Sequence, residues 1–545
     1  YMLIIILEGD FMNYLNALAP YTLYKEICEG DYFVDKTIMI EEVLNELSAA
    51  NKYICVTRPR RFGKTVMAHM LTAFLEKGVD SGSIFADLNI GKSSCYEKHL
   101  NKHDVIFIDF SNMPWNCDSY QTYINFVGKK ISDDLEAEYP ECGIIPEAGP
   151  WEALDRVFSR TGKQFVFIMD EWDSMFHNKL FSKDDQAKFL QFLRLLLKSK
   201  GYVELAYMTG ILPIAKYSSG SELNMFVEYN MATSIKYSEY FGFTEEETAE
   251  LYERYVSLEE TPHFDFESLR EWYNGYQTAN GDRIFNPRAV ICALSSNQIQ
   301  SYWTGSGPYD EIFYYIKNNI AEVREDLVRM VAGEAISVRI QNYAAVSMDL
   351  ETKDEIFSAM VVYGFLSYYD GRVSIPNREL MQKFEDVLTN KNMGYISKLA
   401  LESDRMLAAT LNGDTKEMER ILSFAHDTEI PILNYNDEGD LAALVNLVYL
   451  SARNEYRIER EDRAGKGFAD FLFYPLNPKK DCIILELKVD RNPDDAIGQI
   501  VDKKYALKFR GRLGDESAYT GRILAVGMTY NRDSKEHYCK VIAIR

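Results

Sequence analysis

Four short apolar runs, separated by segments with helical periodicity, constrain the fold of this chain most. The runs lie at 52–56, 104–110, 165–173 and 203–210. Each has the length and composition of a buried strand, whereas segments such as 185–201 repeat apolar residues at helical spacing. Buried strands that alternate with helices are typical of a mostly parallel α/β sheet, which we expect over roughly residues 20–235.

The composition is that of a globular protein. Of the 545 residues, 47% are hydrophobic, which is enough for the packed cores of about two to four domains. The apolar run at 2–7 is too short to cross a bilayer and lacks a basic lead, so we expect a first strand or an added tail there. The eight cysteines are scattered without a C-x-x-C pair, which favours free thiols over a disulfide framework or a zinc site, and a cytoplasmic location. We expect no membrane association, since the run at 2–7 is too short to span a bilayer.

The charge is unevenly distributed along the chain. The net charge of −23 argues against a general nucleic-acid-binding protein. Residues 451–545, however, hold 19 Lys and Arg against 15 Asp and Glu, a balance of +4 that leaves −27 for the remainder. If the protein contacts a polyanion, we therefore expect its C-terminal end to do so.

Between about 240 and 440 the sequence is mainly helical. The segment 244–256 opens on a Thr cap and an acidic first turn, which predicts a helix. The segment 354–380 predicts a helix followed by a hairpin that turns at Asp370 and Gly371, an order that resembles a winged-helix unit. A packing subdomain that touches no nucleic acid is the favoured alternative.

The loop after the first predicted strand resembles a phosphate-binding loop. A standard loop reads G-x-x-x-x-G-K-[ST]; here Gly63, Lys64 and Thr65 fit, and Arg58 replaces the first glycine. Such a loop points backbone N–H groups and a helix N-terminus at phosphates. Lys64 is expected to reach the β- and γ-phosphates, and Thr65 to hold Mg²⁺. Further positive charge around the same anion is expected from Arg58, Arg60 and Arg61.

A second motif follows about 105 residues later. The apolar run at 165–169 ends in Asp170 and Glu171, as a Walker B strand does. Asp170 is expected to hold Mg²⁺ and Glu171 to polarise the attacking water. The next strand ends in Thr209, which is expected to position water near the γ-phosphate; a strand-ending threonine with no such role is an equal alternative. The two motifs together disfavour a chance G-K-T turn.

Several ordered motifs extend this pattern: "YFVDKTIMIEEVL" (32–44), "RPRRFGKT" (58–65), "IMDEWD" (168–173), "WYNGY" (272–276), "FNP" (285–287) and "YWTGSG" (302–307). Together they resemble the bacterial AAA-ATPase-like family, whose members carry R-P-R-R-F-G-K-[ST]. The resemblance implies a site competent for ATP. It assigns no arginine finger: Arg283 and Arg288 are candidates by position only, and a structural salt bridge is the favoured role for each.

The same resemblance implies a C-terminal domain similar to the PD-(D/E)xK nuclease superfamily. Asp470 precedes Glu486-x-Lys488 by a stretch whose midpoint, residue 478, lies in the loop "PLNPKK". A hairpin that turns there places Asp470 opposite Glu486, with Cβ atoms about 5 Å apart. Two such carboxylates and a main-chain carbonyl suit Mg²⁺, with Mn²⁺ as a substitute, and Lys488 then stabilises the nucleophile or the developing charge.

Other residues are weaker candidates. An acid on a preceding helix in 455–462, best Glu459, would complete the metal site, although a solvated charge run is nearly as well supported. Gln499 and Lys503 share a helix face that suits a phosphate backbone, with surface decoration as the equal alternative. His69 and His177 lie near the nucleotide motifs, where we expect packing roles.

These observations predict a P-loop ATPase core at 1–238, a helical and winged-helix-like region at 239–440 and an α+β restriction-endonuclease-like domain at 441–545. The expected function is ATP hydrolysis coupled to Mg²⁺-dependent cleavage of nucleic acid, DNA rather than RNA. The alternative is an ATP-gated interaction switch whose nuclease-like domain binds nucleic acid or protein without cutting. A homo-oligomer or a protein partner stays open.

Overall fold

The structure is a computed structural model. It describes residues 13–48, 50–145, 148–178, 180–214, 222–303, 321–331, 333–340, 350, 352–388, 395–427, 438–464, 467–509 and 519–544. The described residues form two compact units, one within 1–307 and 337–379 and the other within 308–336 and 380–545. The division at 238 and 440 stays a prediction, and the run at 2–7 lies outside the described residues.

The first unit is built on a five-stranded parallel sheet of order β2-β3-β4-β1-β5. Its strands are β1 (Tyr53–Thr57), β2 (Asp104–Asp109), β3 (Phe165–Asp170), β4 (Val203–Gly210) and β5 (Val227–Asn230). The parallel sheet predicted from the apolar runs is therefore confirmed. Because all strands are parallel, the segments that follow β1, β3 and β4 leave the sheet at the same edge.

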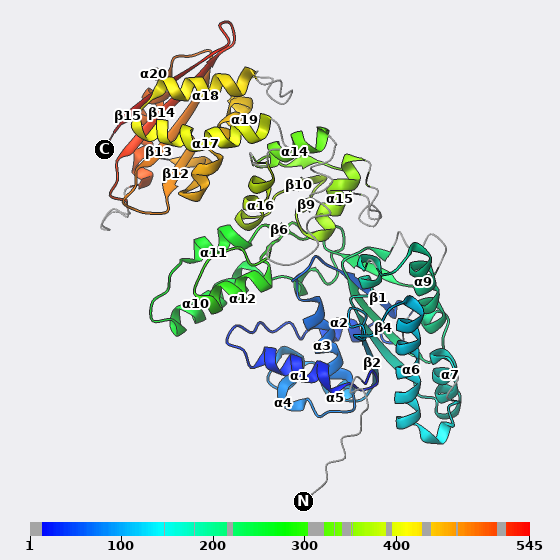
Figure 1. Ribbon diagram of the computed structural model, residues 1–545. Coiled ribbons are helices and arrows are strands. Elements are labelled where there is room, and N and C mark those ends of the chain that lie inside the picture. Colours follow the sequence, from blue (N-terminus) through cyan, green and yellow to red (C-terminus); the bar gives the residue numbers. More distant parts are fainter. Residues whose placement is uncertain are drawn as a thin grey trace, which may run out of the picture. The chain divides into compact units, whose positions relative to one another are not determined.

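Helices cover both faces of this sheet (Figure 1). On one face lie α1 (Leu18–Cys28), α2 (Met39–Leu44) and α3 (Lys64–Leu75), and on the other α6 (Tyr120–Glu138), α7 (Pro150–Thr161) and α9 (Lys183–Leu197). Alternate strand residues serve the two layers: Ile54 and Val56 pack with α3, whereas Tyr53 and Cys55 face α6 and α9. Short elements connect these layers: α4 (Gly82–Phe85), η1 (Asn89–Lys92), α5 (Tyr96–His99), η2 (Pro140–Cys142), α8 (Ser174–His177) and η4 (Ser238–Tyr240).

A helical part follows the sheet in the first unit. It contains α10 (Glu245–Leu258), α11 (Phe266–Tyr273) and α12 (Pro287–Ser296), with the short strands β6 (Tyr276–Gln277) and β7 (Arg283–Ile284). Thr244 caps α10 as predicted, since its hydroxyl accepts from the Glu247 N–H and the Glu247 carboxylate accepts in return. Asn286 caps α12, and Pro287 opens that helix.

A winged-helix-like arrangement ends the first unit. The helix α15 (Lys353–Tyr363) leads into the hairpin of β9 (Ser367–Tyr369) and β10 (Arg372–Ser374), with β8 (Ile336–Ser337) beside β10. Asp370 and Gly371 have φ of 48° and 75°, which is the type I′ geometry of a two-residue hairpin turn. The helix α16 (Arg378–Leu388) follows and continues into the second unit.

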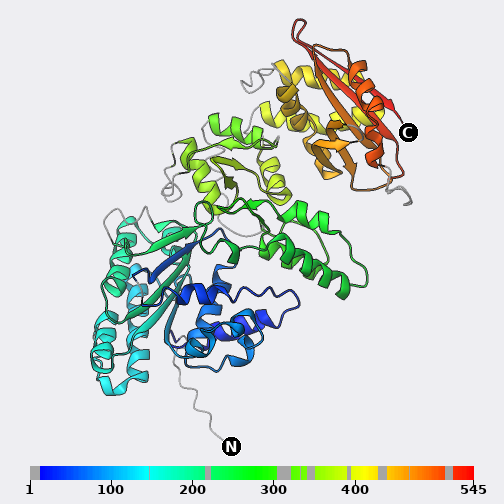
Figure 2. The ribbon, with the colours of Figure 1, turned by 180° about the vertical axis from the view of Figure 1, so that it is seen from behind.

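The second unit is an α+β domain with a mixed sheet of order β11-β12-β13-β14-β15. Its strands are β11 (Tyr456–Ala464), β12 (Gly467–Pro475), β13 (Cys482–Val489), β14 (Ile523–Asn531) and β15 (Glu536–Ala543). Its helices are α14 (Ala321–Val331), α17 (Tyr395–Asn412), α18 (Thr415–Asp427), α19 (Glu438–Val448), η7 (Leu450–Asn454), α20 (Pro493–Asp502) and η8 (Tyr505–Phe509). The helices α17 to α19 share one apolar core with the sheet and α20 shares another, on the opposite face (Figure 2).

The helix expected at 455–462 is wrong, because these residues form β11. Tyr456 is buried and Ile458 packs beside it in the core, so the apolar residues of this segment follow a period of two. β11 pairs antiparallel with β12, with Glu459 opposite Leu472. The alternation is hard to recognise in the sequence because the next two positions of the apolar series hold Arg460 and Asp462.

Two other expectations concern the whole chain. All eight cysteines are free thiols. Among the described residues, no helix is both long and apolar enough to cross a membrane.

Arg58 does not add charge to the anion site, contrary to the expectation from its place in the loop. Its side chain is 1% exposed, and its guanidinium donates to the carbonyl oxygens of Thr57 (2.8 Å), Tyr229 (2.7 Å) and Tyr237 (3.3 Å). It also lies 4.8 Å from the ring centroid of Phe241. Burial lowers the pKa of Arg58 to about 10. The inward side chain supplies donors to main-chain carbonyls at the end of β1, on β5 and in the segment after β5.

We expect Arg58→Met to destabilise the first unit by about 3 kcal/mol, because buried carbonyl groups then lose their charged donor. Differential scanning fluorimetry of the full chain is expected to show the corresponding transition about 5–10 °C lower. Arg60→Met, in the same loop, is the control and is expected to leave this transition nearly unchanged. If Arg58→Met unfolds at the same temperature as the wild type but binds ATP more weakly, Arg58 does contribute to anion binding.

Candidate nucleotide and metal sites

The loop between β1 and α3 turns at Gly63. Gly63 has φ of 87°, in the left-handed region, and a Cβ atom placed there would meet nothing within 4 Å. The backbone conformation, and not lack of space, therefore explains the glycine. α3 begins at the next residue, Lys64, so the free N–H groups of its first turn lie directly after this loop.

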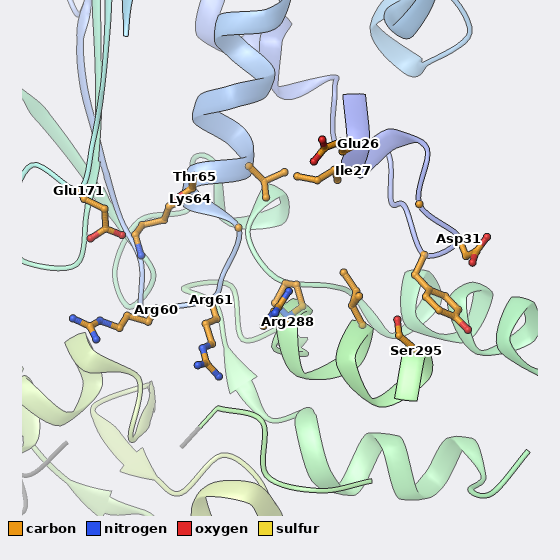
Figure 3. Close-up of a pocket in the computed structure, with 16 residues that line it drawn as sticks. Glu26, Ile27, Asp31, Arg60, Arg61, Lys64, Thr65, Glu171, Arg288 and Ser295 are labelled. Carbon is orange, nitrogen blue, oxygen red and sulfur yellow. The ribbon is translucent and has the colours of Figure 1, made fainter. Parts of the chain in front are cut away.

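A cavity of about 690 Å³ lies against this loop. Six of the residues predicted for the nucleotide site line it: Arg60, Arg61, Gly63, Lys64, Thr65 and Glu171. Figure 3 shows the side chains of Lys64 and Glu171 directed toward one another, although they come from segments more than a hundred residues apart. The fold thus brings the loop after β1 and the acid after β3 to one pocket.

Lys64 is held at the loop by main-chain acceptors. Its ammonium donates to the carbonyl oxygens of Arg58 and Pro59, both at 3.0 Å, and only 4% of the residue is exposed. These contacts fix the amine at the wall of the cavity without neutralising it. A fixed ammonium group beside free helix N–H groups is an arrangement that binds phosphate.

Glu171 is directed into the cavity by an unusual backbone conformation. Its φ is 49°, and the next N–H, of Trp172, donates to the Thr209 carbonyl at 3.0 Å. Burial raises the pKa of the Glu171 carboxyl, Asp173 and Asp170 add to the rise, and Lys64 opposes it most. A non-glycine residue in the left-handed region is strained, and such strain is frequent at functional sites.

Asp170 and Thr209 lie behind the cavity and do not line it. Asp170 is 1% exposed and Thr209 is fully buried, and the Thr209 hydroxyl donates to the Asp170 carboxylate. The Asp170 carbonyl accepts from Phe110 N–H at 3.0 Å. The two predicted residues are therefore brought together, with Thr209 fixing the orientation of the Asp170 carboxylate.

The sequence did not predict which residues form the other wall of the cavity. It comes from α12, through Pro287, Arg288, Ile291 and Ser295, and from α1 and the segment after it, through Glu26, Ile27, Gly30, Asp31 and Tyr32. Arg288 is exposed there, and within the described part of the chain its guanidinium makes no ion pair. Arg283 lies on β7 and does not line the cavity. The "FNP" motif directly before Arg288 was the available signal.

The two histidines near these motifs have packing contacts. His69 on α3 is buried with its ring centroid 5.5 Å from that of Phe107, and burial lowers its pKa. His177 packs edge-on against Tyr363, with ring centroids 5.9 Å apart, and its Nε2 also lies 3.3 Å from the Asp173 carboxylate. Neither residue lines the nucleotide cavity.

The second candidate site lies where β12 and β13 separate. The pairs Phe471–Leu485 and Leu472–Ile484 are in register, so Asp470 and Glu486 are the next residues along the two strands. The Asp470 carboxylate accepts from the Leu487 N–H at 2.7 Å. The hairpin register predicted from the loop midpoint is therefore confirmed, and it brings the two acids to one place.

Glu486 and Lys488 are both buried there, at 1% and 8% exposure. The Lys488 ammonium donates to the Glu486 carboxylate at 3.1 Å and to the Leu487 carbonyl at 2.8 Å. The Gln499 amide from α20 donates to the same Glu486 oxygen, Oε1. Gln499 thus faces the site, whereas Lys503 is the C-cap of α20, where its N–H donates to the Gln499 carbonyl at 3.1 Å.

The other oxygen of Glu486 suits a cation. Oε2 is buried and has no hydrogen-bond partner among the described residues. Burial raises the pKa of Glu486 to about 7, with Asp470 adding to the rise and Lys488 opposing it. Two carboxylates and the Leu487 carbonyl are oxygen donors of the type that Mg²⁺ prefers. Among the described residues, no group of three or more His, Cys, Asp or Glu side chains could hold a metal ion.

Glu459 lies on β11 and forms an ion pair with Arg457 at 3.2 Å. Its register partner is Leu472, two positions from Asp470 along β12. The role of Glu459 as a third ligand stays a prediction.

Comparisons with known proteins match the two parts of the chain in which these candidate sites lie. Residues 22–219 match the family described as predicted AAA-ATPase, and residues 437–534 match the PD-(D/E)XK nuclease superfamily. A relative from Azotobacter chroococcum mcd 1, named as an uncharacterized protein in the vnfD 5′ region, is 23% identical over 547 residues, which cover 94% of this chain and 96% of the relative.

Among solved structures, the Walker-type ATPase PABY2304 of Pyrococcus abyssi is similar, with 12% identity, a TM-score of 0.33 and coverage of 64% of this chain and 94% of that chain. The ORC2 protein of Aeropyrum pernix has 12% identity, a TM-score of 0.30 and coverage of 64% and 92%. At these scores the likeness adds nothing to the fold derived above. The family matches carry the identification: residues 22–219 form a domain of the predicted AAA-ATPase family, and residues 437–534 form a domain of the PD-(D/E)XK nuclease superfamily.

Proposed function

We propose that the first unit binds and hydrolyses ATP. The observation that carries this proposal is the convergence of Lys64, Thr65 and Glu171 on one cavity. Lys64 and the first-turn N–H groups of α3 bind the β- and γ-phosphates, and Arg60 and Arg61 add positive charge. Thr65, at the cavity, and Asp170, behind it, would hold Mg²⁺, which would supply positive charge to the phosphates. Glu171 orients and polarises the attacking water, and Thr209 positions Asp170.

A smaller apolar recess supports an adenine nucleotide. It has a volume of about 90 Å³ and adjoins the main cavity, since both are lined by Ile27, Tyr32, Gly63, Val66, Pro287 and Ile291. Its other lining residues include Tyr24, Phe62 and Phe243, and also Lys36. A lining of mostly aromatic and aliphatic side chains suits a base, so one nucleotide can direct its base there and its phosphates to Lys64.

For the second unit we propose Mg²⁺-dependent cleavage of a phosphodiester bond in nucleic acid, DNA rather than RNA. The carrying observation is the buried, unpartnered Oε2 of Glu486 beside Asp470 and Lys488. Asp470, Glu486 and the Leu487 carbonyl would hold the metal, which would supply a Lewis acid for the water and positive charge for the phosphate. Lys488 stabilises the developing charge, and Gln499 fixes the Glu486 carboxylate. The mildly basic C-terminal end is consistent with a polyanionic substrate.

The second candidate is an ATP-gated switch that binds nucleic acid or a protein partner without cutting it. The observation that favours it is the direct Lys488–Glu486 bond, which partly neutralises the acid that a metal would need. Either function fits a cytoplasmic protein, and either leaves a homo-oligomer open.

The ATP site is tested by two substitutions with different consequences. We expect Lys64→Ala to weaken ATP binding about 30-fold or more, because a buried charge facing the phosphates is removed. Glu171→Gln is expected to bind ATP normally but to hydrolyse it about 10²-fold more slowly. Calorimetry and phosphate release measure the two effects. Lys129→Ala, an exposed lysine on α6, is the control; equal ATP affinity in Lys64→Ala and the wild type would exclude the site.

The metal site is tested in the same way. We expect Glu486→Ala and Asp470→Asn to lose both cleavage and divalent-metal binding. Lys488→Ala is expected to keep the metal but to cleave about 10²–10³-fold more slowly, since one preorganised charge is lost. Cleavage of mixed DNA and RNA with Mg²⁺ or Mn²⁺, with and without ATP, is the assay, and Lys480→Ala on the exposed β12–β13 turn is the control. No cleavage under any condition, with unchanged metal titration in Glu486→Ala, supports the switch.

The pKa of Glu486 makes metal binding depend on pH. Because the carboxyl has a pKa of about 7 without metal, Mn²⁺ must displace a proton below that pH. We expect the Mn²⁺ affinity to fall about tenfold for each pH unit below 7 and to level off above it. In Lys488→Met the pKa is expected to rise, because Lys488 lowers it, so the inflection should move to higher pH. A flat profile between pH 5.5 and 8.5 by calorimetry would contradict Glu486 as a ligand.

A further inference from the structure

The residues that replace a glycine-rich phosphate loop do more than line the nucleotide cavity. Pro59 and Phe62 both face outward from the loop into the helical and winged-helix-like part of the first unit. Phe62 packs edge-on against Tyr276, with ring centroids 4.9 Å apart. A Cβ atom on Gly364, at the end of α15, would lie 2.7 Å from Pro59. The Tyr276 hydroxyl donates to the Gly364 carbonyl at 3.0 Å, so the two contacts are joined.

Arg61 makes the most direct of these connections. It lines the nucleotide cavity (Figure 3), and its guanidinium donates to the Tyr302 carbonyl. Its φ of 69° is in the left-handed region, which is unfavourable for a residue with a side chain. Nothing in the phosphate site itself requires an arginine with this backbone conformation, because Lys64 and Arg60 already supply charge there.

The segment that Arg61 contacts is tied to α16. Glu379, in the first turn of that helix, is 2% exposed and accepts from the Ser301 hydroxyl at 3.1 Å and from the Trp303 N–H. The Tyr302 N–H and the charge of Arg61 also stabilise the Glu379 carboxylate, against the effect of burial, which raises its pKa. Trp303 is buried and packs edge-on against Phe365, with centroids 5.1 Å apart.

We propose that Arg61 is the residue through which a bound triphosphate is sensed: its guanidinium bridges the phosphates and the Tyr302 carbonyl, and so holds residues 301–303 against Glu379 of α16. This inference rests on the proposed ATP site and adds its regulation. A guanidinium has five N–H donors in a planar fork and can serve two acceptors at once, which a lysine cannot do with the same geometry. The phosphates add a second anchor to a side chain that already holds Tyr302.

This contact reaches α16, a helix through which the chain passes from one unit to the other. α16 begins in the first unit, where Arg378 donates to Glu271 at 3.0 Å, and its later residues belong to the second. Residues 301–303 are therefore the place where the state of the nucleotide site reaches this connecting helix.

Hydrogen exchange of the full chain tests the inference, because the N–H groups of Tyr302 and Trp303 are the donors to Glu379. With saturating Mg²⁺ and a non-hydrolysable ATP analogue, we expect these two amides to exchange about tenfold more slowly than without nucleotide, the effect of one additional hydrogen bond on local opening. In Arg61→Gly the backbone conformation is preserved. Nucleotide should still bind through Lys64, but the slowing should disappear. Glu379→Gln should also reduce it.

Arg60→Ala is the matched control, since it removes an arginine from the same loop and the same cavity without touching Tyr302. It should weaken nucleotide binding and, at saturation, keep the slowing. Calorimetry on each variant establishes saturation. Equal slowing in Arg61→Gly and the wild type would overturn the sensing role while leaving the ATP site intact. If the wild type binds no nucleotide, calorimetry shows it directly, and both the proposed function and this inference fall.

Discussion

A buried guanidinium organises the nucleotide-binding end of the first unit. β1 ends inside the protein, where the Thr57 carbonyl at its end lies near a main-chain carbonyl of β5 and one of the segment after β5. Arg58 supplies donors to Thr57, Tyr229 and Tyr237, so it joins the end of β1 to β5 and to the segment beyond it. The Lys64 ammonium in turn donates to the Arg58 and Pro59 carbonyls. A glycine at position 58 would leave these groups to water or unsatisfied, which in a buried loop is costly. Arg58 therefore takes the place of the glycine by stabilising the loop from the protein interior. The positive charge that faces the phosphates comes from neighbouring residues of the loop.

The sequence was sufficient for elements whose pattern is local. Four apolar runs predicted β1 to β4, because a strand buried on both faces has a continuous apolar composition. Thr244 and the pair Asp370 and Gly371 predicted a cap and a turn, since each residue type has a specific backbone role there. The register that places Asp470 next to Glu486 followed from the loop midpoint alone, because a short hairpin allows few alternatives.

What the sequence could not give depends on contacts between distant segments. The inward direction of Arg58 requires β5 and Phe241, which lie more than 160 residues away. β11 was taken for a helix because its charges obscure a period of two that only pairing with β12 reveals. The α12 wall of the cavity, with Arg288, depends on how the helical part folds back on the sheet. The link from Arg61 to Tyr302 and Glu379 likewise leaves no pattern in the local sequence, because phosphate binding alone would account for an arginine in a phosphate-binding loop.

The two candidate sites share one energetic arrangement. In each, one acid is fixed by a neutral donor while a second is buried unfavourably. At the nucleotide site, Thr209 donates to Asp170, whereas Glu171 has a strained backbone and a raised pKa. At the second site, Asp470 accepts from a backbone N–H, whereas one oxygen of Glu486 has no hydrogen-bond partner among the described residues. A protein selected only for stability would replace Glu171 and Glu486 with neutral residues, because a buried acid without a full set of partners lowers the free energy of unfolding. Their nearest cations, Lys64 and Lys488, offset part of this cost but are each shared with main-chain carbonyls. A bound cation or a proton would relieve the remaining imbalance at each place. The unfavourable burial of Glu171 and Glu486 is therefore consistent with the roles proposed for them, Glu171 beside the nucleotide phosphates and Glu486 as a metal ligand.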